Sequence, residues 1–352
     1  MAAPWRGVIH EYRDRLPAFQ NVITLGEGGT PLIHSPWLSN IVHGDVWLKV
    51  EGDNPTGSFK DRGMTAAISA AVDEGAKAVV CASTGNTSAS MAAFAARAEL
   101  TPIVLVPHGR IAAGKMAQAV MHGAEVIQVR GNFDDCLTMS RGLAKEYPVV
   151  LVNSVNPMRL QGQKTASFEI VDQIGDAPDL HVLPVGNAGN IAAYWLGFRE
   201  YHQDGPATKT PVMWGFQAAG AAPLVHGAPV ANPETVATAI RIGNPASWTL
   251  AEQARDESGG RISSVTDEQI LSAQREIASR DGTFVEPASA AGVAGLLEAA
   301  AAGEVERGLR ITVTVTGHGL KDTETALSGI ESIVDSVIDA DVLAAAEAAG
   351  LA

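Results

Sequence analysis

The chain has 352 residues, of which 46% are hydrophobic and 18% are charged, a composition typical of a folded enzyme with one or two domains. Its formal net charge of −14 excludes a generally basic surface, so we expect neither nucleic acid nor a membrane as a partner. No apolar signal core or membrane-spanning run is present, which favours a cytoplasmic location. Cys81 and Cys136 lack the spacing of metal ligands and are expected to be buried free thiols, so no metal site is predicted.

From about residue 45, short apolar runs alternate with segments of helical period, which predicts a largely parallel sheet with helices on both faces. In the first series, the predicted strands are Asp45–Val50, Ala78–Ala82, Pro102–Val106, Ala124–Val129 and Val149–Asn153. The helices predicted between them are Asp61–Glu74, Thr87–Ala98, Gly114–His122 and Asp134–Glu146.

In a second series, the predicted strands are His181–Val185, Val212–Gln217 and Ile311–Thr316. The predicted helices are Lys164–Ile174, Ile191–Tyr201, Thr266–Ser279, Pro287–Ala300 and Ala340–Ala349. Thr266 and Gln269 have the spacing of a capping box. Two such units side by side leave a crevice at the carboxyl ends of their strands, where ligands bind in open α/β sheets.

The segment NPTGSFKDRG, Asn54 to Gly63, places Lys60 at the start of a predicted helix, after a turn that contains Pro55 and Gly57. The positive end of the helix dipole disfavours an ammonium at this position, and a neutral amine is the form that makes a Schiff base. Taken alone, Lys60 is more often a solvated residue, because most lysines are exposed. The other motifs decide between the two interpretations.

The segment ASTGNTSAS, Ala82 to Ser90, follows a predicted strand and opens a predicted helix. Its hydroxyl and amide side chains, with the free N–H groups of the helix start, would bind a carboxylate. An ordinary helix cap with a tight turn explains this motif equally well.

The segment GNAGN, Gly186 to Asn190, also connects a predicted strand to a helix. Glycines let the backbone approach an anion, and the helix end supplies N–H donors. The segment matches neither GxGxxG nor the P-loop, which favours a single phosphate ester over a dinucleotide or a nucleoside triphosphate. A tight turn without a ligand is the alternative.

The segment VTVTGHGLKD, Val313 to Asp322, contains Thr316 at the end of a predicted strand. Its hydroxyl would point into the crevice and could hydrogen-bond a ring nitrogen without fixing a positive charge on it. His318 has no visible partner and is expected to be a bystander rather than an acid–base group.

Three further charged residues are candidates for the crevice. Arg159 and Lys164 lie in NPMRLQGQKT, and an arginine can hold a phosphate with two hydrogen bonds, although a surface arginine is the alternative. Glu286 in FVEPASAA begins a predicted helix, where it either shapes the pocket or only stabilises the helix start.

Together and in this order, the motifs resemble the β-family, or fold type II, of pyridoxal-phosphate enzymes, and within it the threonine synthases most closely. The resemblance also includes LGEGGTPL (Leu25–Leu32), and it covers residues 5 to 335. It implies a tryptophan synthase β-like α/β fold, with two three-layer open domains and largely parallel sheets. The larger cofactor-binding domain would comprise residues 1–45 and 147–352, and the smaller mobile domain residues 46–146.

The resemblance implies a role for each motif. Lys60 would be the catalytic residue and hold pyridoxal 5'-phosphate as a Schiff base, Asn86 would bind its ring hydroxyl, and Thr316 would meet its pyridine nitrogen. The cofactor phosphate would lie against Gly186, Asn187, Ala188, Gly189 and Asn190. The substrate carboxylate and neighbouring groups would meet Ser83, Thr84 and Thr87. The phosphate of the substrate would be bound by Thr87, Ser154, Arg159 and Asn187.

The implied reaction converts O-phospho-L-homoserine and water to L-threonine and phosphate, in a homodimer. A threonine or serine dehydratase of the same fold is the nearest alternative, although its motifs usually read SFKxRGA and SAGNHAQ where this chain has SFKDRGM and STGNTSAS. A nicotinamide-dependent oxidoreductase would need a dinucleotide fingerprint, which the chain lacks. A noncatalytic binding protein would have no need of Lys60.

Overall fold

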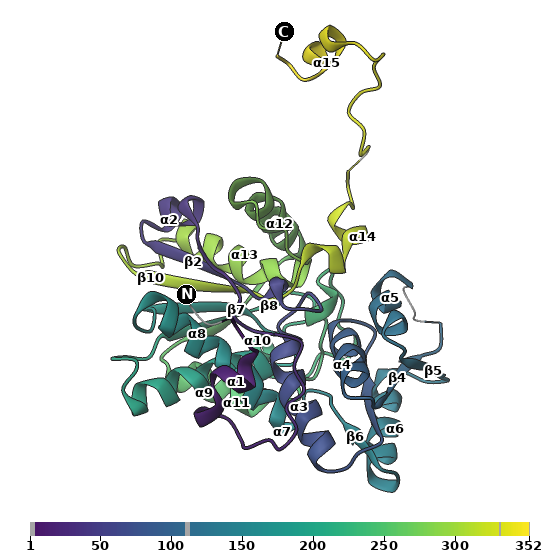
Figure 1. The fold of residues 1–352 in the computed structure, drawn as a ribbon. Helices are drawn as coiled ribbons and strands as arrows, with labels where there is room; N and C mark the ends of the chain where they lie inside the picture. Colours follow the sequence, from purple (N-terminus) through teal and green to yellow (C-terminus); the bar gives the residue numbers. More distant parts are fainter. Residues whose placement is uncertain (1–3, 110–112, 331, 352) are drawn as a thin grey trace.

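The computed structural model describes residues 4–109, 113–330 and 332–351, and it places their strands in two sheets (Figure 1). The larger sheet has the order β1-β2-β10-β7-β8-β9, in which only β1 is antiparallel to its neighbour. Its strands are β1 (Leu32–His34), β2 (Asp45–Val50), β7 (Leu180–Pro184), β8 (Val212–Ala218), β9 (Arg261–Val265) and β10 (Arg310–Val315). The smaller sheet is wholly parallel, in the order β5-β4-β3-β6. Its strands are β3 (Ala78–Ala82), β4 (Thr101–Pro107), β5 (Glu125–Val129) and β6 (Val149–Leu151).

Helices cover both faces of each sheet, as the continuous apolar strands predict. One face of the larger sheet packs against α2 (Pro36–Val42), α12 (Asp267–Asp281) and α13 (Pro287–Ala301), and the other against α8 (Thr165–Ile174), α9 (Gly189–Asp204) and α11 (Trp248–Glu257). One face of the smaller sheet packs against α3 (Lys60–Asp73), α4 (Asn86–Arg97) and α5 (Ala113–Met121), and the other against α6 (Phe133–Glu146). The predicted α/β fold with largely parallel sheets is therefore confirmed.

The remaining described elements are short. They are α1 (Val8–Glu11), α7 (Pro157–Gln163), α10 (Pro223–His226), α14 (Thr323–Ala326), α15 (Val342–Ala348), and the 3-10 turns η1 (Arg13–Arg15), η2 (Glu51–Asp53), η3 (Thr238–Ile240) and η4 (Gly319–Lys321). In the described part of the chain, no helix is both long and apolar enough to cross a bilayer. Cys81 and Cys136 are free and buried, as expected.

The predicted elements agree closely with those observed, with informative exceptions. The capping box of Thr266 and Gln269 is present. The prediction of a strand up to Asn153 is wrong, because β6 ends at Leu151 and the Asn153 amide instead bonds the backbone N–H and C=O of Ala82, both at 3.0 Å. Strand β2 pairs within the larger sheet, and β6 pairs within the smaller one. Strand pairing therefore divides the chain after β2 and after β6, which lies beyond the predicted boundaries after residues 45 and 146. The division into two domains stays a prediction.

A buried guanidinium ties the start of α3 to the larger sheet. Arg62 donates to both carboxylate oxygens of Glu51, at 2.7 and 2.8 Å, and to both of Glu169, at 2.5 and 2.7 Å. Lys49 on β2 adds an ion pair to Glu169 at 2.8 Å. Burial alone would raise the pKa of Glu169, but Arg62 and Lys49 hold it at about 2. All four charges are buried, and each has an opposite charge within hydrogen-bond distance.

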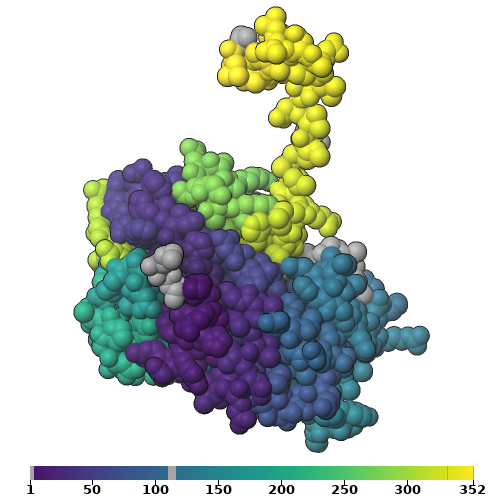
Figure 2. Space-filling view, in the orientation of Figure 1, coloured from purple at the N-terminus to yellow at the C-terminus, as the bar shows by residue number. Residues whose placement is uncertain are grey.

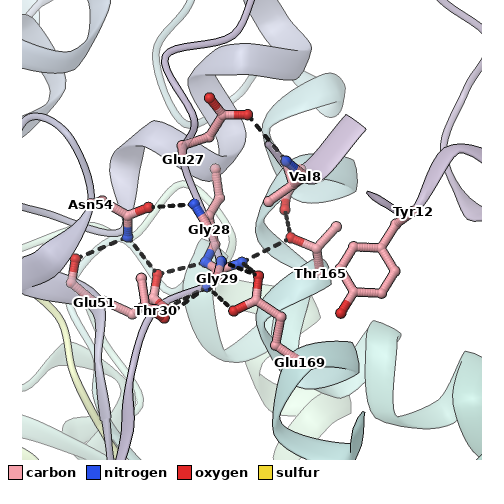
Figure 3. Close-up of polar contacts among 12 residues, drawn as sticks. Val8, Tyr12, Glu27, Gly28, Gly29, Thr30, Glu51, Asn54, Thr165 and Glu169 are labelled. Carbon is pink, nitrogen blue, oxygen red and sulfur yellow. Dashed lines mark hydrogen bonds and ion pairs between the residues drawn. The ribbon is translucent and has the colours of Figure 1, made fainter. Parts of the chain in front are cut away.

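The LGEGGTPL segment is held by the same carboxylates (Figure 3). Thr30 donates its hydroxyl to Glu51 at 2.7 Å, and the Gly29 N–H donates to Glu169 at 3.0 Å. The Gly28 N–H donates to Asn54 at 2.9 Å, and the Asn54 amide donates in turn to Glu51 at 3.0 Å. This motif therefore has a structural role here: it encloses the ion network that anchors α3.

Replacing Arg62 by methionine should destabilise the fold strongly. The substitution keeps much of the apolar volume but leaves Glu51 and Glu169 buried without their main counter-charge, which costs about 3–5 kcal/mol of unfolding free energy. Urea denaturation followed by circular dichroism measures it. The matched control is Arg280→Met, which breaks the exposed ion pair with Glu276 and should change stability far less. Equal losses in the two variants would contradict the role of the network.

Candidate active site

Lys60 lies where the start of α3 meets the end of β10. The Phe59 N–H donates to the Thr316 carbonyl at 3.0 Å, and the His318 N–H donates to the Gly57 carbonyl at 2.9 Å. Lys60 is the first residue of α3, as the sequence predicts to within one residue. Burial, reinforced by the positive charge of Arg159, lowers the pKa of the Lys60 amine to about 7, while Glu286 opposes the shift. A large fraction of the amine is therefore neutral near pH 7, the form needed to attack an aldehyde.

Arg159 reaches this region because α3 and α7 pack backbone to backbone. A Cβ on Gly162 would lie 1.9 Å from the Arg62 carbonyl, and one on Gly63 would lie 2.8 Å from the Arg159 carbonyl, so only glycine permits the contact. Arg159 is 1% exposed, which rules out a surface arginine. Its Nη1 donates to the Val152 carbonyl at 2.9 Å, and its Nε has no partner among the described residues.

Asn86 joins the smaller sheet to the larger one. It begins α4, and its amide donates to the two carboxylate oxygens of Glu286 at 2.9 and 3.1 Å. Glu286 is the residue before α13, and its own N–H donates to the Gly317 carbonyl at 3.0 Å. Burial raises the pKa of Glu286, against the effects of Asn86, Lys321 and Lys60. Glu286 therefore contacts the start of α4 and does more than stabilise a helix start.

Thr316 is buried directly after β10. Its Oγ lies 2.8 Å from the hydroxyl of Ser289, in the first turn of α13. The neighbouring His318 caps η4, with its Nδ1 accepting from the Leu320 N–H at 3.1 Å. This contact gives His318 a structural use and supports the expectation of a bystander.

The GNAGN segment forms a backbone cradle between β7 and α9. Ala188 adopts the left-handed conformation, with φ of 66°, directly before the first helical residue. The Asn187 side chain accepts from the Ala246 N–H at 3.1 Å, which holds the turn in place. Asn190 is 9% exposed, and both polar atoms of its amide lack a partner among the described residues. A polar ligand or an ordered water at this helix start would satisfy the Asn190 amide.

Four of the predicted substrate residues, Ser83, Thr84, Thr87 and Ser154, follow the carboxyl ends of strands of the smaller sheet, whereas Arg159 lies on α7 and Asn187 follows β7 of the larger sheet. Ser83 follows β3 and Ser154 follows β6, two neighbouring parallel strands, so their carboxyl ends lie together. Thr84 and Thr87 lie on either side of the start of α4, and all four residues are partly buried. Lys164 is not available to a ligand in the same way, because it forms an ion pair with Glu200 at 2.8 Å.

Sequence reasoning missed two residues of this region. Ser289 bonds Thr316, and the Ser247 N–H donates to the Asn187 carbonyl at 3.2 Å. Ser289 lies in the EPASAA motif, at the position expected to face the strand end once α13 begins at Pro287. No sequence signal links Ser247 to residue 187, because their contact depends on the fold alone.

The lowered pKa of Lys60 predicts an unusual pH profile of amine reactivity. Acetylation of Lys60 by trace acetic anhydride, in protein without added ligands, should rise with pH and level off above about 7. An ordinary exposed lysine continues to gain reactivity up to about pH 10, because only the neutral amine reacts. Peptide mass spectrometry measures both in one sample. Parallel profiles for Lys60 and the exposed lysines would refute the shift.

Comparisons with known proteins agree with this geometry. The pyridoxal-phosphate dependent enzyme family matches residues 23–317. The chain is 59% identical to a threonine synthase of Mycobacterium leprae, covering 99% of this chain and 97% of that protein. It is 53% identical to a threonine synthase of Synechocystis, covering 99% and 92%.

Solved structures show the same fold at low sequence identity. Maize serine racemase superposes with a TM-score of 0.74 at 22% identity, covering 88% of this chain and 92% of that chain. A processed threonine deaminase isoform 2 from Solanum lycopersicum gives a TM-score of 0.74 at 20% identity, covering 94% and 99%. These likenesses establish the fold type II architecture. The sequence identities to the two threonine synthases, 59% and 53%, are far higher than those to the solved structures. The chain thus belongs to the pyridoxal-phosphate-dependent enzymes and, within them, to the threonine synthase family.

Proposed function

We propose that this enzyme converts O-phospho-L-homoserine and water to L-threonine and phosphate, using pyridoxal 5'-phosphate. The observation that carries the proposal is the 59% identity to a threonine synthase over nearly the whole of both chains. The lowered pKa of the Lys60 amine, the turn before α9 and the buried Thr316 hydroxyl at the end of β10 support it.

The residues of the crevice fit the cofactor. The cradle of Gly186, Asn187, Ala188, Gly189 and Asn190 offers N–H groups at a helix start, and the unpaired Asn190 amide requires a polar partner such as a phosphate. Lys60 supplies the amine that would bind the cofactor aldehyde, Asn86 an amide for its ring hydroxyl, and Thr316 a hydroxyl for its ring nitrogen. When bound, the cofactor delocalises the negative charge that develops on the substrate's α carbon.

The protein residues would then bind the substrate and move protons. The Nζ atom of Lys60 would carry protons at the substrate carbons, which its lowered pKa makes feasible near neutral pH. Ser83, Thr84 and Thr87 would hold the substrate carboxylate and its neighbouring groups. Thr87, Ser154, Arg159 and Asn187 would hold the phosphate that is expelled. The enclosed position of Arg159 would strengthen its attraction to that phosphate, because little water screens it.

We also infer a homodimer that acts in the cytoplasm. In the described segment after α14, several large apolar side chains are exposed, among them Ile333, Val337, Val342 and Leu343. This segment projects from the body of the molecule (Figure 2), and exposed apolar surface favours association. A biosynthetic role supports the location. Sedimentation equilibrium measures the mass in solution, and cell fractionation measures the location.

The activity is tested by supplying O-phospho-L-homoserine to the cofactor-loaded enzyme. Phosphate and L-threonine should appear in equal amounts, while Lys60→Ala should lose turnover by orders of magnitude because it removes the Schiff-base amine and the proton carrier together. A colorimetric phosphate assay and chromatography of the amino acid measure the two products. An oxo acid from L-threonine, without phosphate release from phosphohomoserine, would identify a dehydratase instead.

Arg159 is tested with substitutions that separate its charge from its packing. Arg159→Met keeps a long apolar side chain but removes the charge-assisted contact. The Kd of inorganic phosphate as an inhibitor should therefore rise roughly tenfold to a hundredfold. Arg159→Lys should lose less, because it keeps the charge. Cofactor content, read from absorbance, should be unchanged in both. Unaltered phosphate inhibition in Arg159→Met would leave Arg159 with a structural role only.

A further inference from the structure

Ser289 makes an unusually complete set of hydrogen bonds at the end of β10. Its side chain is fully buried in the first turn of α13. Its Oγ accepts from the Thr316 N–H at 3.0 Å and from the Gly317 N–H at 2.7 Å. The same Oγ lies 2.8 Å from Thr316 Oγ and 3.2 Å from the Gly317 carbonyl. The serine therefore contacts the strand end through four polar atoms.

The capacity of a hydroxyl fixes the direction of these bonds. A serine hydroxyl has two acceptor lone pairs and one proton. The two backbone N–H groups occupy both lone pairs of Ser289, so Ser289 cannot accept a hydrogen bond from Thr316. Its single proton must be donated, and Thr316 Oγ is closer than the Gly317 carbonyl. That carbonyl already accepts from the Glu286 N–H at 3.0 Å, so it does not depend on Ser289.

We propose that Ser289 is a positioning residue that makes Thr316 a hydrogen-bond donor toward the ring nitrogen of the cofactor, and thereby keeps that nitrogen unprotonated. The proposal rests on the proposed function, which places the ring nitrogen at Thr316. The proton of Thr316 cannot go to Ser289, and the described part of the chain offers Thr316 Oγ no other partner. An unprotonated ring nitrogen is the acceptor that this proton needs.

A protonated ring nitrogen would disturb this arrangement. It would require Thr316 Oγ to accept a hydrogen bond, and the Thr316 proton would then be buried without an acceptor, which is unfavourable. The charges that act on Glu286 beside this turn belong to Lys60, Lys321 and Asp322, while Arg159 acts on Lys60 and Asp61 on Lys321, so their signs are mixed. A substitution at Ser289 leaves these charges in place. A change in the protonation of the ring nitrogen in such a variant therefore reports on the hydrogen bond between the Ser289 and Thr316 hydroxyls.

The test is ¹⁵N NMR of the holoenzyme reconstituted with ring-¹⁵N pyridoxal 5'-phosphate, because the chemical shift reports protonation of that nitrogen without turnover. In the wild type, the nitrogen should stay unprotonated through neutral pH. In Ser289→Ala, Thr316 is free to accept, and the nitrogen should take up its proton about one pH unit higher, a tenfold change. Ser289→Cys keeps a weaker donor and acceptor and should show a smaller shift in the same direction, and it replaces the alanine variant if that variant fails to bind cofactor.

Two controls separate positioning from a purely structural role. Ser140→Ala removes another fully buried serine, which donates to the Cys136 carbonyl in α6, and should lower stability without moving the titration. In a Thr316→Val background, Ser289→Ala should cause no further shift, because the residue through which Ser289 acts is gone.

A wild-type nitrogen that is protonated at neutral pH would overturn the proposal. So would a Ser289→Ala titration equal to that of the wild type, or an equal shift in the presence and absence of Thr316. Failure of the proposed function is recognised separately, because an enzyme that binds the cofactor but forms no threonine still gives an interpretable ¹⁵N spectrum.

Discussion

The structure around Lys60 depends on one guanidinium, which belongs to Arg62 and is held between two buried carboxylates. Glu51 follows β2 and Glu169 lies on α8, so the two hydrogen-bonded pairs fix α3 against both the larger sheet and its helical layer. Desolvating these charges is costly, and apolar residues could fill the same space at less cost. The ion pairs instead fix the orientation of α3. A bidentate pair has good geometry only when the helix takes one rotation about its axis and one position along it. Lys60 lies two residues earlier on the same helix, so its position is fixed by the same contacts.

The site as a whole is assembled from helix starts. Lys60, Asn86 and Gly189 are the first residues of α3, α4 and α9, and Glu286 directly precedes α13. Each start follows a strand end or a turn bonded to one, and the first N–H groups of a helix have no partner within the helix. In the proposed function, this arrangement would let a chain with a net charge of −14 hold two phosphates. The positive potential would come from backbone dipoles and buried cations such as Arg159, while the buried carboxylates Glu51 and Glu169 are paired with Arg62 and Lys49.

Much of this arrangement was predictable because it is encoded locally. Strand ends followed by small polar residues and glycines predicted the turn before α9, the Asn86 loop and the position of Thr316. Apolar runs located eight of the ten described strands and missed β1 and β9. Helix α7 was missed although Asn156 caps it and Pro157 occupies its first position, since the segment is short and has little apolar period. The burial of Arg159 could not be predicted, because it results from the approach of Gly63 to a helix a hundred residues away. The contacts of Glu286 with Asn86 and of Ser289 with Thr316 also join distant segments, so the local sequence pattern does not predict them.

The bond between Asn86 and Glu286 has a consequence for how the protein unfolds. The proposed cofactor residues follow strands of both sheets or begin helices packed on them, and in the described structure this amide–carboxylate contact connects the two units. A ligand held at one end by Asn86 and at the other by the cradle beside β7 binds only when both sheets are folded. The binding free energy of the ligand then stabilises both sheets, because unfolding of either sheet releases the ligand. In the proposed binding, the cofactor would link the stability of the two sheets, so calorimetric unfolding of the loaded enzyme should be more cooperative than that of the cofactor-free chain.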